Sequence, residues 1–264
     1  GGSPRVGDIR IPSVGGEGNY PVTGIGHGAF WRCSGLTSVA IPNGVTYIGE
    51  GAFRECVNLT SVTIPDSVTD IETSAFEDCS GLKNLTIGKG VSKIGVSVFS
   101  GCSSLTSVTI PESVKYISFR AFQNCKSLKN VKTMNPNTII MNNAFAGCDA
   151  LANGAGFSVV NGVVTRYAGK GGNVTIPTGV TSIGSYAFTS CGKSLASVII
   201  PSSVTSIGKS AFSGCKNLSK VTIEKGVTSI GASAFDGCEA ASLASAFCLH
   251  SNEHTSSSVL SQMY

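Results

Sequence analysis

Charged residues are scarce in this chain, since Asp, Glu, Lys and Arg make up 13% of its 264 residues. That is about half the share of an ordinary soluble domain, so most of the polar surface must be Ser, Thr and Asn. No apolar run reaches the roughly 18 residues that a membrane-spanning helix needs, and the sequence therefore predicts no membrane insertion. No secretory signal and no anchor segment are visible in the chain either.

Groups for catalysis and metal binding are also few. The chain has three histidines, His27, His250 and His254, and its ten cysteines form no C-x-x-C pair. Zinc-ligand spacing is therefore missing. His250 and His254 have the spacing of a helical metal pair, but their Ser-rich flanks argue against a helix. No glycine-rich phosphate loop and no Ser-His-Asp set stands out. We therefore predict no enzyme, no metal and no cofactor.

What the chain does contain is a repeat. The motif A-F-x-x-C recurs with Phe at 30, 53, 76, 122, 145, 188, 212 and 235, and Phe99 has Val98 in place of Ala. Phe positions 30 to 145 are spaced by 23 residues, and the next steps are 43, 24 and 23. Self-similarity at such a period is typical of a stacked array, in which each unit buries its apolar face against its neighbours.

One repeat, from Cys56 to Phe76, reads C-x-x-L-x-x-V-x-I-P-x-x-V-x-x-I-x-x-x-A-F. Val62 and Ile64 alternate with polar residues, which predicts a short strand with one face buried. Pro65 ends that strand because it has no N–H to donate. Strands of successive coils would pair in parallel, about 4.8 Å apart. In the returning half, most coils carry a glycine at one fixed position, which suggests positive φ or a close backbone approach: Gly26, Gly49, Gly95, Gly184, Gly208 and Gly231.

About twenty extra residues enter between Cys148 and Phe188. Asn161-Gly162 lies there between two β-rich runs, which is a strong hairpin signal. The hairpin is either a partner-contact loop or a joint between two sub-arrays. We expect about nine coils over residues 1–238, with the hairpin insertion at 152–172. Residues 239–264 are expected to form a C-terminal cap, with a short helix at 239–249, and a flexible tail.

Nine of the ten cysteines lie three residues after a repeat Phe. A constant place in every coil predicts a column of small buried thiols that pack as hydrophobes. A disulfide between neighbouring coils would need converging Cβ vectors, whereas equivalent stacked residues point the same way. Cys248 stands outside this series and is the candidate reactive thiol.

Charge is distributed unevenly along the chain. Residues 50–78 hold seven acids and one base, and residues 83–132 hold eight bases and one acid. Such segments could steer a charged partner, or they could be a solvated surface without that role. An acidic polysaccharide bound by the segment Lys115–Lys132 is a further possibility, and its affinity would fall steeply with salt.

The stretch Ile200-Pro-Ser-Ser-Val-Thr-Ser-Ile-Gly-Lys-Ser-Ala-Phe-Ser-Gly-Cys215 resembles the BspA-like leucine-rich repeats of bacterial and protozoan surface proteins. The resemblance covers about residues 9 to 238 and implies a repeat solenoid. Such a solenoid has a parallel β-sheet on one face, short turns, 3-10 or β segments on the other, and here one inserted β-hairpin. It also implies a secreted or cell-surface protein that attaches to host proteins or to other microbes.

Solenoids commonly bind partners with the outward residues of their strands. Here that face is small, polar and nearly uncharged, and it offers no aromatic platform for sugars or bases, so no nucleic-acid partner is expected. Strand propensity alone would also select such a face. The residue types typical of binding hot spots lie elsewhere, at Trp31, Tyr47, Tyr116, Arg120, Arg166 and Tyr167. The candidate partner-binding residues are Ser61, Thr63, Thr86, Thr109, Lys132, Thr175, Lys220, Arg166 and Tyr167.

The sequence and the resemblance together predict a non-enzymatic protein-binding repeat module, a bacterial cell-surface adhesin or part of one. Its partner would be a host or microbial surface protein. The alternative is a structural spacer that displays other domains and has no ligand of its own. The oligomeric state is not predicted.

Overall fold

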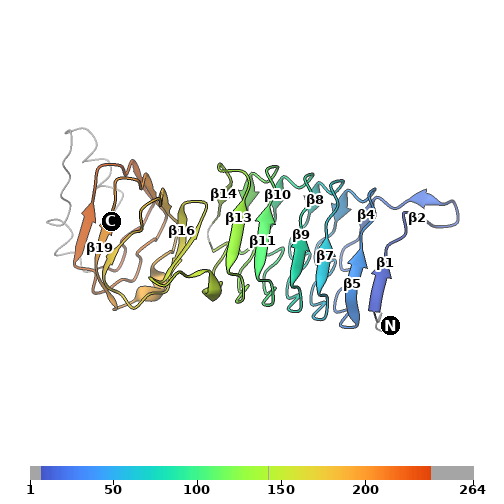
Figure 1. Cartoon of the computed structure of the whole chain (residues 1–264), viewed down its shortest axis with the longest axis horizontal. Helices are drawn as coiled ribbons and strands as arrows, with labels where there is room; N and C mark the ends of the chain where they lie inside the picture. Colours follow the sequence, from blue (N-terminus) through green and yellow to red (C-terminus); the bar gives the residue numbers. More distant parts are fainter. Residues whose placement is uncertain (1–6, 142, 239–264) are drawn as a thin grey trace. The chain divides into compact units, whose positions relative to one another are not determined.

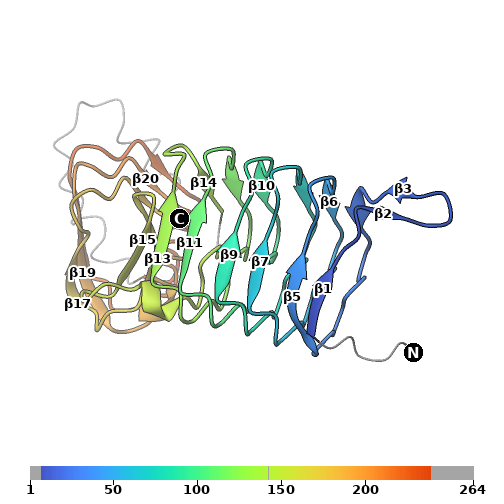
Figure 2. The ribbon, with the colours of Figure 1, turned by 45° about the vertical axis from the view of Figure 1, so that its right-hand side comes forward.

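The computed structural model describes residues 7–141 and 143–238. The chain divides into two compact units, Gly1–Leu151 (unit 1) and Ala152–Tyr264 (unit 2), which are described in turn. In both, parallel strands of successive coils stack side by side, so the predicted repeat solenoid is confirmed (Figures 1 and 2). The expected capping helix at 239–249, Cys248, His250 and His254 lie outside the described residues.

One side of unit 1 is built from the strands that contain the L-x-x-V-x-I pattern. The first four pair in parallel as β1 (Gly7–Arg10), β5 (Leu36–Ala40), β7 (Ser61–Thr63) and β9 (Asn84–Thr86). The next two, β11 (Ser107–Ile110) and β13 (Asn130–Thr133), also pair in parallel. Partner residues are 23 apart, as in Val62 opposite Leu85. The offset between paired residues in the sheet therefore equals the 23-residue period of the repeat.

The other side of unit 1 consists of two-residue strands, here called the return strands. They pair in parallel as β4 (Gly24–Ile25), β6 (Tyr47–Ile48) and β8 (Asp70–Ile71), and as β10 (Lys93–Ile94), β12 (Tyr116–Ile117) and β14 (Ile139–Ile140). A small antiparallel pair, β2 (Val14–Gly15) and β3 (Tyr20–Pro21), projects from the coils at the N-terminal end of unit 1 (Figure 2). A 3-10 turn, η1 (Asp149–Leu151), ends the unit.

The core of unit 1 lies between these two sides and consists of columns of equivalent residues. The Phe rings from Phe30 to Phe145 stack with centroids 5.0–5.5 Å apart and planes within 20° of parallel. Phe53, Phe76, Phe99 and Phe122 have no exposed surface. Burial of large aromatic side chains dominates core energetics, so this stack is the main apolar contribution of each coil.

The turns around each Phe require left-handed backbone at two fixed places. The residue two before Phe and the residue two after it both have positive φ in most coils of unit 1, for example Ser74 (58°) and Asp78 (58°) around Phe76. The glycine that recurs after the return strand does not have positive φ. A Cβ on Gly49 would instead lie 2.8 Å from the backbone carbon of Gly26 in the preceding coil. Close approach of stacked backbones therefore explains that glycine.

Unit 2 begins with the predicted hairpin, β15 (Phe157–Val160) and β16 (Val163–Tyr167), which are antiparallel. Asn161 (φ 50°) and Gly162 (φ 72°) form its turn, as a type I′ connection requires. β16 also pairs in parallel with the first return strand of unit 2. The inserted hairpin is thus part of the stack, because its second strand takes the place of a return strand.

The remaining coils of unit 2 repeat the pattern of unit 1. β17 (Gly172–Thr175), β19 (Leu195–Ile200) and β21 (Lys220–Ile223) form one parallel sheet. β18 (Ser182–Ile183), β20 (Ser206–Ile207) and β22 (Ser229–Ile230) continue the return side after β16. A 3-10 turn, η2 (Thr189–Cys191), follows Phe188.

Candidate functional site

The outward residues of β7, β9, β11 and β13, here called the strand face, bring five of the predicted site residues together in unit 1. Thr63 lies opposite Thr86, and Thr109 lies opposite Lys132, in parallel registers. Ser61, on the same face, is half-buried, while the other four are exposed. These residues are all polar, and Lys132 is the one charged residue among the five.

Thr175 and Lys220 belong to the corresponding sheet of unit 2. Thr175 on β17 pairs with Ile199 on β19, whereas Lys220 on β21 pairs with Ser197. Both predicted residues are exposed, but one strand separates them and they lie in different columns. Ile199 is 40% exposed between them, so this sheet presents an apolar side chain where unit 1 presents threonine.

The two predicted site residues on the hairpin, Arg166 and Tyr167, differ in how far they are exposed to solvent. Tyr167 was expected at a partner surface, and the structure corrects this, because only 4% of Tyr167 is exposed. Its ring centroid lies 5.0 Å from that of Phe188 and 4.7 Å from that of Phe157. Tyr167 therefore takes the place of a repeat Phe at the start of the aromatic stack. Arg166, on the opposite face of β16, is half-buried beside Ser158 of β15.

A second surface of unit 1 carries larger side chains than the strand face. The outward positions of its return strands hold Tyr47, Asp70, Lys93, Tyr116 and Ile139, here called the return column. Tyr47 pairs with Asp70, and Tyr116 pairs with both Lys93 and Ile139. Tyr116 is 44% and Ile139 is 53% exposed. The sequence singled out the two tyrosines by residue type, but Ile139 showed no signal, because its coil departs from the repeat pattern.

The cysteine column is buried, as predicted, and nine free cysteines lie among the described residues. Seven of the thiols donate to the carbonyl of the Phe in the preceding coil, as in Cys79 Sγ to Phe53 O at 3.1 Å. Desolvation by burial raises the pKa of Cys56 to about 12. Neutral thiols at this depth are poor nucleophiles and poor metal ligands. Residues 7–141 and 143–238 contain no group of His, Cys, Asp and Glu that could hold a metal ion.

The charged residues of the first coils form ion pairs along the turns that follow each Phe. Arg32 Nε lies 2.7 Å from Glu55 Oε2, and Arg54 Nε lies 3.2 Å from Glu77 Oε2. Hydrogen bonds from Arg32 and then from Trp31 lower the pKa of Glu55. Two of the seven acidic residues in the segment 50–78, Glu55 and Glu77, therefore form ion pairs with arginines of neighbouring coils.

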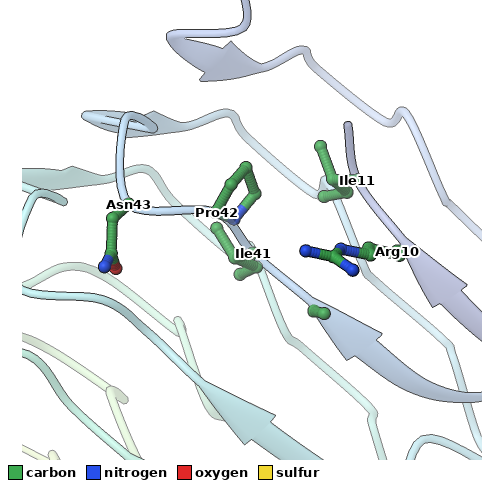
Figure 3. A pocket seen from close by; sticks show the side chains of 6 residues that line it. Arg10, Ile11, Ile41, Pro42 and Asn43 are labelled. Carbon is green, nitrogen blue, oxygen red and sulfur yellow. The ribbon is translucent and has the colours of Figure 1, made fainter. Parts of the chain in front are cut away.

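A hollow of about 460 Å³ lies where β1 and β5 end, lined by Arg10, Ile11, Ala40, Ile41, Pro42 and Asn43. Figure 3 shows the Arg10 guanidinium between the side chains of Ile11 and Ile41. Arg10 is the one charged side chain in this lining. The hollow brings together no set of groups that could carry out acid–base or nucleophilic chemistry.

In the part of the chain that the structure describes, no helix has both the length and the apolar character needed to cross a membrane.

Comparison with known proteins identifies the repeat. The sequence profile of the BspA type leucine-rich repeat region matches residues 23–152 and 167–262, in six copies. A solved leucine-rich cell surface protein from Faecalibacterium prausnitzii A2-165 is 31% identical, with a TM-score of 0.55, and the match covers 88% of this chain and 79% of that chain. No curated protein sequence matches the chain significantly.

Two further solved structures are less similar. The leucine-rich repeat protein of T. pallidum is 23% identical, with a TM-score of 0.43, over 97% of this chain and 83% of its own. The pneumococcal vaccine antigen PcpA is 18% identical, with a TM-score of 0.46, over 89% of this chain and 70% of its own.

Proposed function

Because the chain belongs to the BspA-type leucine-rich repeat family, we propose that it is a non-enzymatic protein-binding module of a bacterial cell-surface adhesin. The similar structure from Faecalibacterium prausnitzii is a cell surface protein, which supports a secreted or surface location. The partner in this proposal is a host protein or a surface protein of another microbe.

The observation that carries the proposal is the return column of unit 1. Tyr116 and Ile139 lie next to each other with 44% and 53% of their surfaces exposed. Met141, at the end of the same coil side, is 50% exposed. Exposed apolar side chains that lie together commonly mark an interaction surface, and tyrosine is enriched among residues that dominate binding energy.

Charge complements this apolar surface. Lys93 is the register neighbour of Tyr116, Lys115 precedes Tyr116 in the chain, and the Arg120 guanidinium lies 4.7 Å from the centre of the Phe119 ring. A partner with acidic groups around an apolar centre would fit this arrangement, since complementary potentials favour association. The strand face, from Ser61 to Lys132, is the second candidate surface of the same module.

The spacer is the alternative function, and the strand face favours it. The residues of the strand face are small. Just before the strands, Ser and Thr hydroxyls donate to backbone carbonyls of the preceding coil, as Thr60 Oγ1 does to Thr37 O at 3.1 Å. Such hydroxyls stabilise the stack and need no partner. If the strand face and the return column both serve only to stabilise the stack, the protein would be a spacer that displays other domains.

The test uses the whole chain immobilised against a panel of purified extracellular-matrix proteins and bacterial surface proteins, measured by biolayer interferometry. We expect at least one panel protein to bind, and the double variant Tyr116→Ser/Ile139→Ser to weaken that binding by about tenfold or more. The matched variant Thr86→Ser/Thr109→Ser keeps the hydroxyls of the strand face and should bind like the unmodified chain.

Two results would count against the proposal. If no panel protein binds, the spacer is the better description. If binding is unchanged in the Tyr116→Ser/Ile139→Ser variant but is lost in Thr86→Arg/Thr109→Arg, the module binds through the strand face and the return column is not its site. Antibody labelling of intact producing cells tests the surface location separately.

A further inference from the structure

A small cleft lies beside the turns of the first coils of unit 1. Its volume is about 170 Å³, and it is lined by His27, Gly28, Trp31, Glu50, Gly51, Arg54 and Ser74. The volume is well below the roughly 300–1,000 Å³ of pockets for drug-sized ligands. The cleft therefore has room for one ring or one short side chain.

Two of the residues that line the cleft are glycines, which place no side chain in it. Gly28 and Gly51 occupy the left-handed position two residues before Phe, and both have φ of 58°. Later coils place a side chain at this position with nearly the same backbone, Ser97 (54°), Arg120 (58°) and Asn143 (58°). Left-handed backbone therefore does not require glycine here, and the missing side chains open the space.

Trp31 is held in a fixed position at the wall of the cleft. Its indole Nε1 donates to Glu55 Oε1 at 3.3 Å, while Arg32 Nε donates to Glu55 Oε2 at 2.7 Å. The Arg32 guanidinium also lies 4.7 Å from the centre of the indole ring. Trp31 nevertheless remains 52% exposed. A braced and exposed indole loses little freedom when a ligand stacks on it, which favours binding.

The polar groups that can bind a ligand in the cleft belong to side chains and not to the backbone of the two glycines. The N–H groups of Gly28 and Gly51 already donate to Glu50 O and Thr73 O of the following coils, at 3.0 and 3.1 Å. His27 Nδ1 lies 3.9 Å from Glu50 Oε2. Glu50 offers acceptor oxygens, Arg54 offers donors, and the imidazole and the Ser74 hydroxyl can do either. The lining thus offers both donors and acceptors beside an aromatic ring.

We propose that this cleft binds a single pyranose ring of a sugar. A pyranose has a flat C–H face that can cover the indole and a ring of hydroxyls that can both donate to and accept from the surrounding groups. A cationic side chain is disfavoured, because Arg32 already lies over the indole and Arg54 lines the cleft. A nucleotide is disfavoured because a cleft of about 170 Å³ has no room for a base together with its ribose and phosphate. This activity is separate from protein binding, and it uses different residues.

Trp31 is the one tryptophan of the chain, so tryptophan fluorescence reports on the cleft alone. The experiment titrates the whole chain with methyl glycosides of glucose, galactose, mannose and N-acetylglucosamine. We expect a saturable change with at least one of them, with a dissociation constant of about 1 mM, since a single ring makes few contacts. Isothermal titration calorimetry of Trp31→Ala with the same glycoside should show at least tenfold weaker binding.

The matched variants are Gly51→Asn and Ser233→Asn. Asn143 shows that asparagine accepts this backbone in unit 1, and Ser233 has the same conformation (φ 56°) in unit 2, so both variants should fold. Gly51→Asn adds a side chain to the lining of the cleft and should abolish the fluorescence response, whereas Ser233→Asn should leave it unchanged.

Three results would overturn the proposal. One is the lack of a saturable response to any of the four glycosides. Another is a response that persists in Gly51→Asn, which would place the sugar outside the cleft. The third is a response to the methyl ester of acetyl-lysine, or to adenosine, together with none to the glycosides, which would assign the cleft to that other chemistry. Loss of protein binding in the Tyr116→Ser/Ile139→Ser variant would leave all of these results unaffected.

Discussion

The two units use the same coil but place different residues on the outward side of their return strands. In unit 1 the return column changes at every coil, from Tyr47 through Asp70 and Lys93 to Tyr116 and Ile139. In unit 2 the outward positions of β18, β20 and β22 are all serine, at Ser182, Ser206 and Ser229. The coil therefore constrains only the inward Ile of each return strand, and the outward residue can vary without affecting the core.

Two of these serines interact within the stack. The hydroxyls of Ser182 and Ser206 lie 2.7 Å apart, and both residues are half-buried. The larger side chains of unit 1 instead extend into solvent, and Tyr47 is 39% exposed. The difference indicates that the return side of unit 2 serves the fold, whereas the return side of unit 1 has surface to offer a partner.

The largest expected effect tests what the two units share. Phe99 and Phe212 are both fully buried between two stacked rings. Replacing either with Ala should lower the free energy of unfolding by about 3–5 kcal/mol, through lost burial and the cavity left behind. Urea denaturation measures the loss, and hydrogen exchange should locate it in the unit that carries the change.

The control for these two variants is Phe99→Leu, which keeps most of the volume and should cost about 1.5 kcal/mol or less. A Phe99→Ala variant as stable as the unmodified chain would contradict the buried stack.

The next largest effect is a difference between the two units in how their stability depends on pH. Desolvation by burial raises the pKa of Cys56 in unit 1 from an ordinary 9.0 to about 12. The fold therefore favours the neutral thiol, and this stabilisation is fully present below about pH 9 and is lost as pH rises toward 12. In unit 2 the hydrogen bond with Cys215 lowers the pKa of Cys191, whereas burial raises the pKa of Cys238 to about 11. Burial also raises the pKa of Cys79 and Cys102 in unit 1, so more of the stability of unit 1 depends on neutral thiols.

Unfolding by urea at several pH values, combined with hydrogen exchange, should show unit 1 losing stability more steeply above pH 9 than unit 2. Cys56→Ala should make the alkaline decline of unit 1 shallower. Equal stability of unit 1 at neutral pH and near pH 11 would contradict the prediction.

A smaller effect concerns the hairpin, which is present in unit 2. Gly162 has φ of 72°, and a Cβ there would lie 2.8 Å from Thr181 Oγ1. Gly162→Ala should therefore destabilise unit 2 by about 1–2 kcal/mol, through backbone strain and crowding. Gly154→Ala is the matched control, because no atom lies within 4 Å of its added Cβ. Equal melting temperatures for the two variants would argue against the observed turn.

The smallest effect tests the serine and tyrosine columns directly. Ser206→Ala removes the hydroxyl pair with Ser182 and should cost about 1 kcal/mol in unfolding free energy. Tyr116→Ser gives unit 1 the residue of unit 2, and because Tyr116 is a surface side chain the cost should stay within about 0.5 kcal/mol. A larger loss for Tyr116→Ser would mean that the return column is structural, and it would weaken its assignment to partner binding.

Several features of the fold could be predicted because they follow from a 23-residue apolar period. Val62 and Ile64 alternate with polar neighbours, so their inward orientation was readable from one repeat. The cysteine positions were readable because a constant place in a stack makes a column. The hairpin followed from Asn161-Gly162, whose left-handed backbone is a local property of those two residues.

Other features depended on contacts between coils and were not readable from the chain. Tyr167 looked like a surface residue of a hairpin, yet β16 pairs with β18 and carries the ring into the aromatic stack. Left-handed backbone falls on residues as different as Arg120 and Ser74, so no residue type marked these positions. The cleft beside Trp31 arises from glycines of two neighbouring coils, and only stacking brings them together.

The sequence by itself determined the inside of this protein. A side chain that repeats every 23 residues meets its own copies, and columns of Phe, Ile, Val, Leu and Cys can exclude water only by stacking. The outside was decided by the tertiary structure. Which exposed residues become neighbours depends on the register between coils and on the turns around each Phe, and these set the return column and the cleft at Trp31.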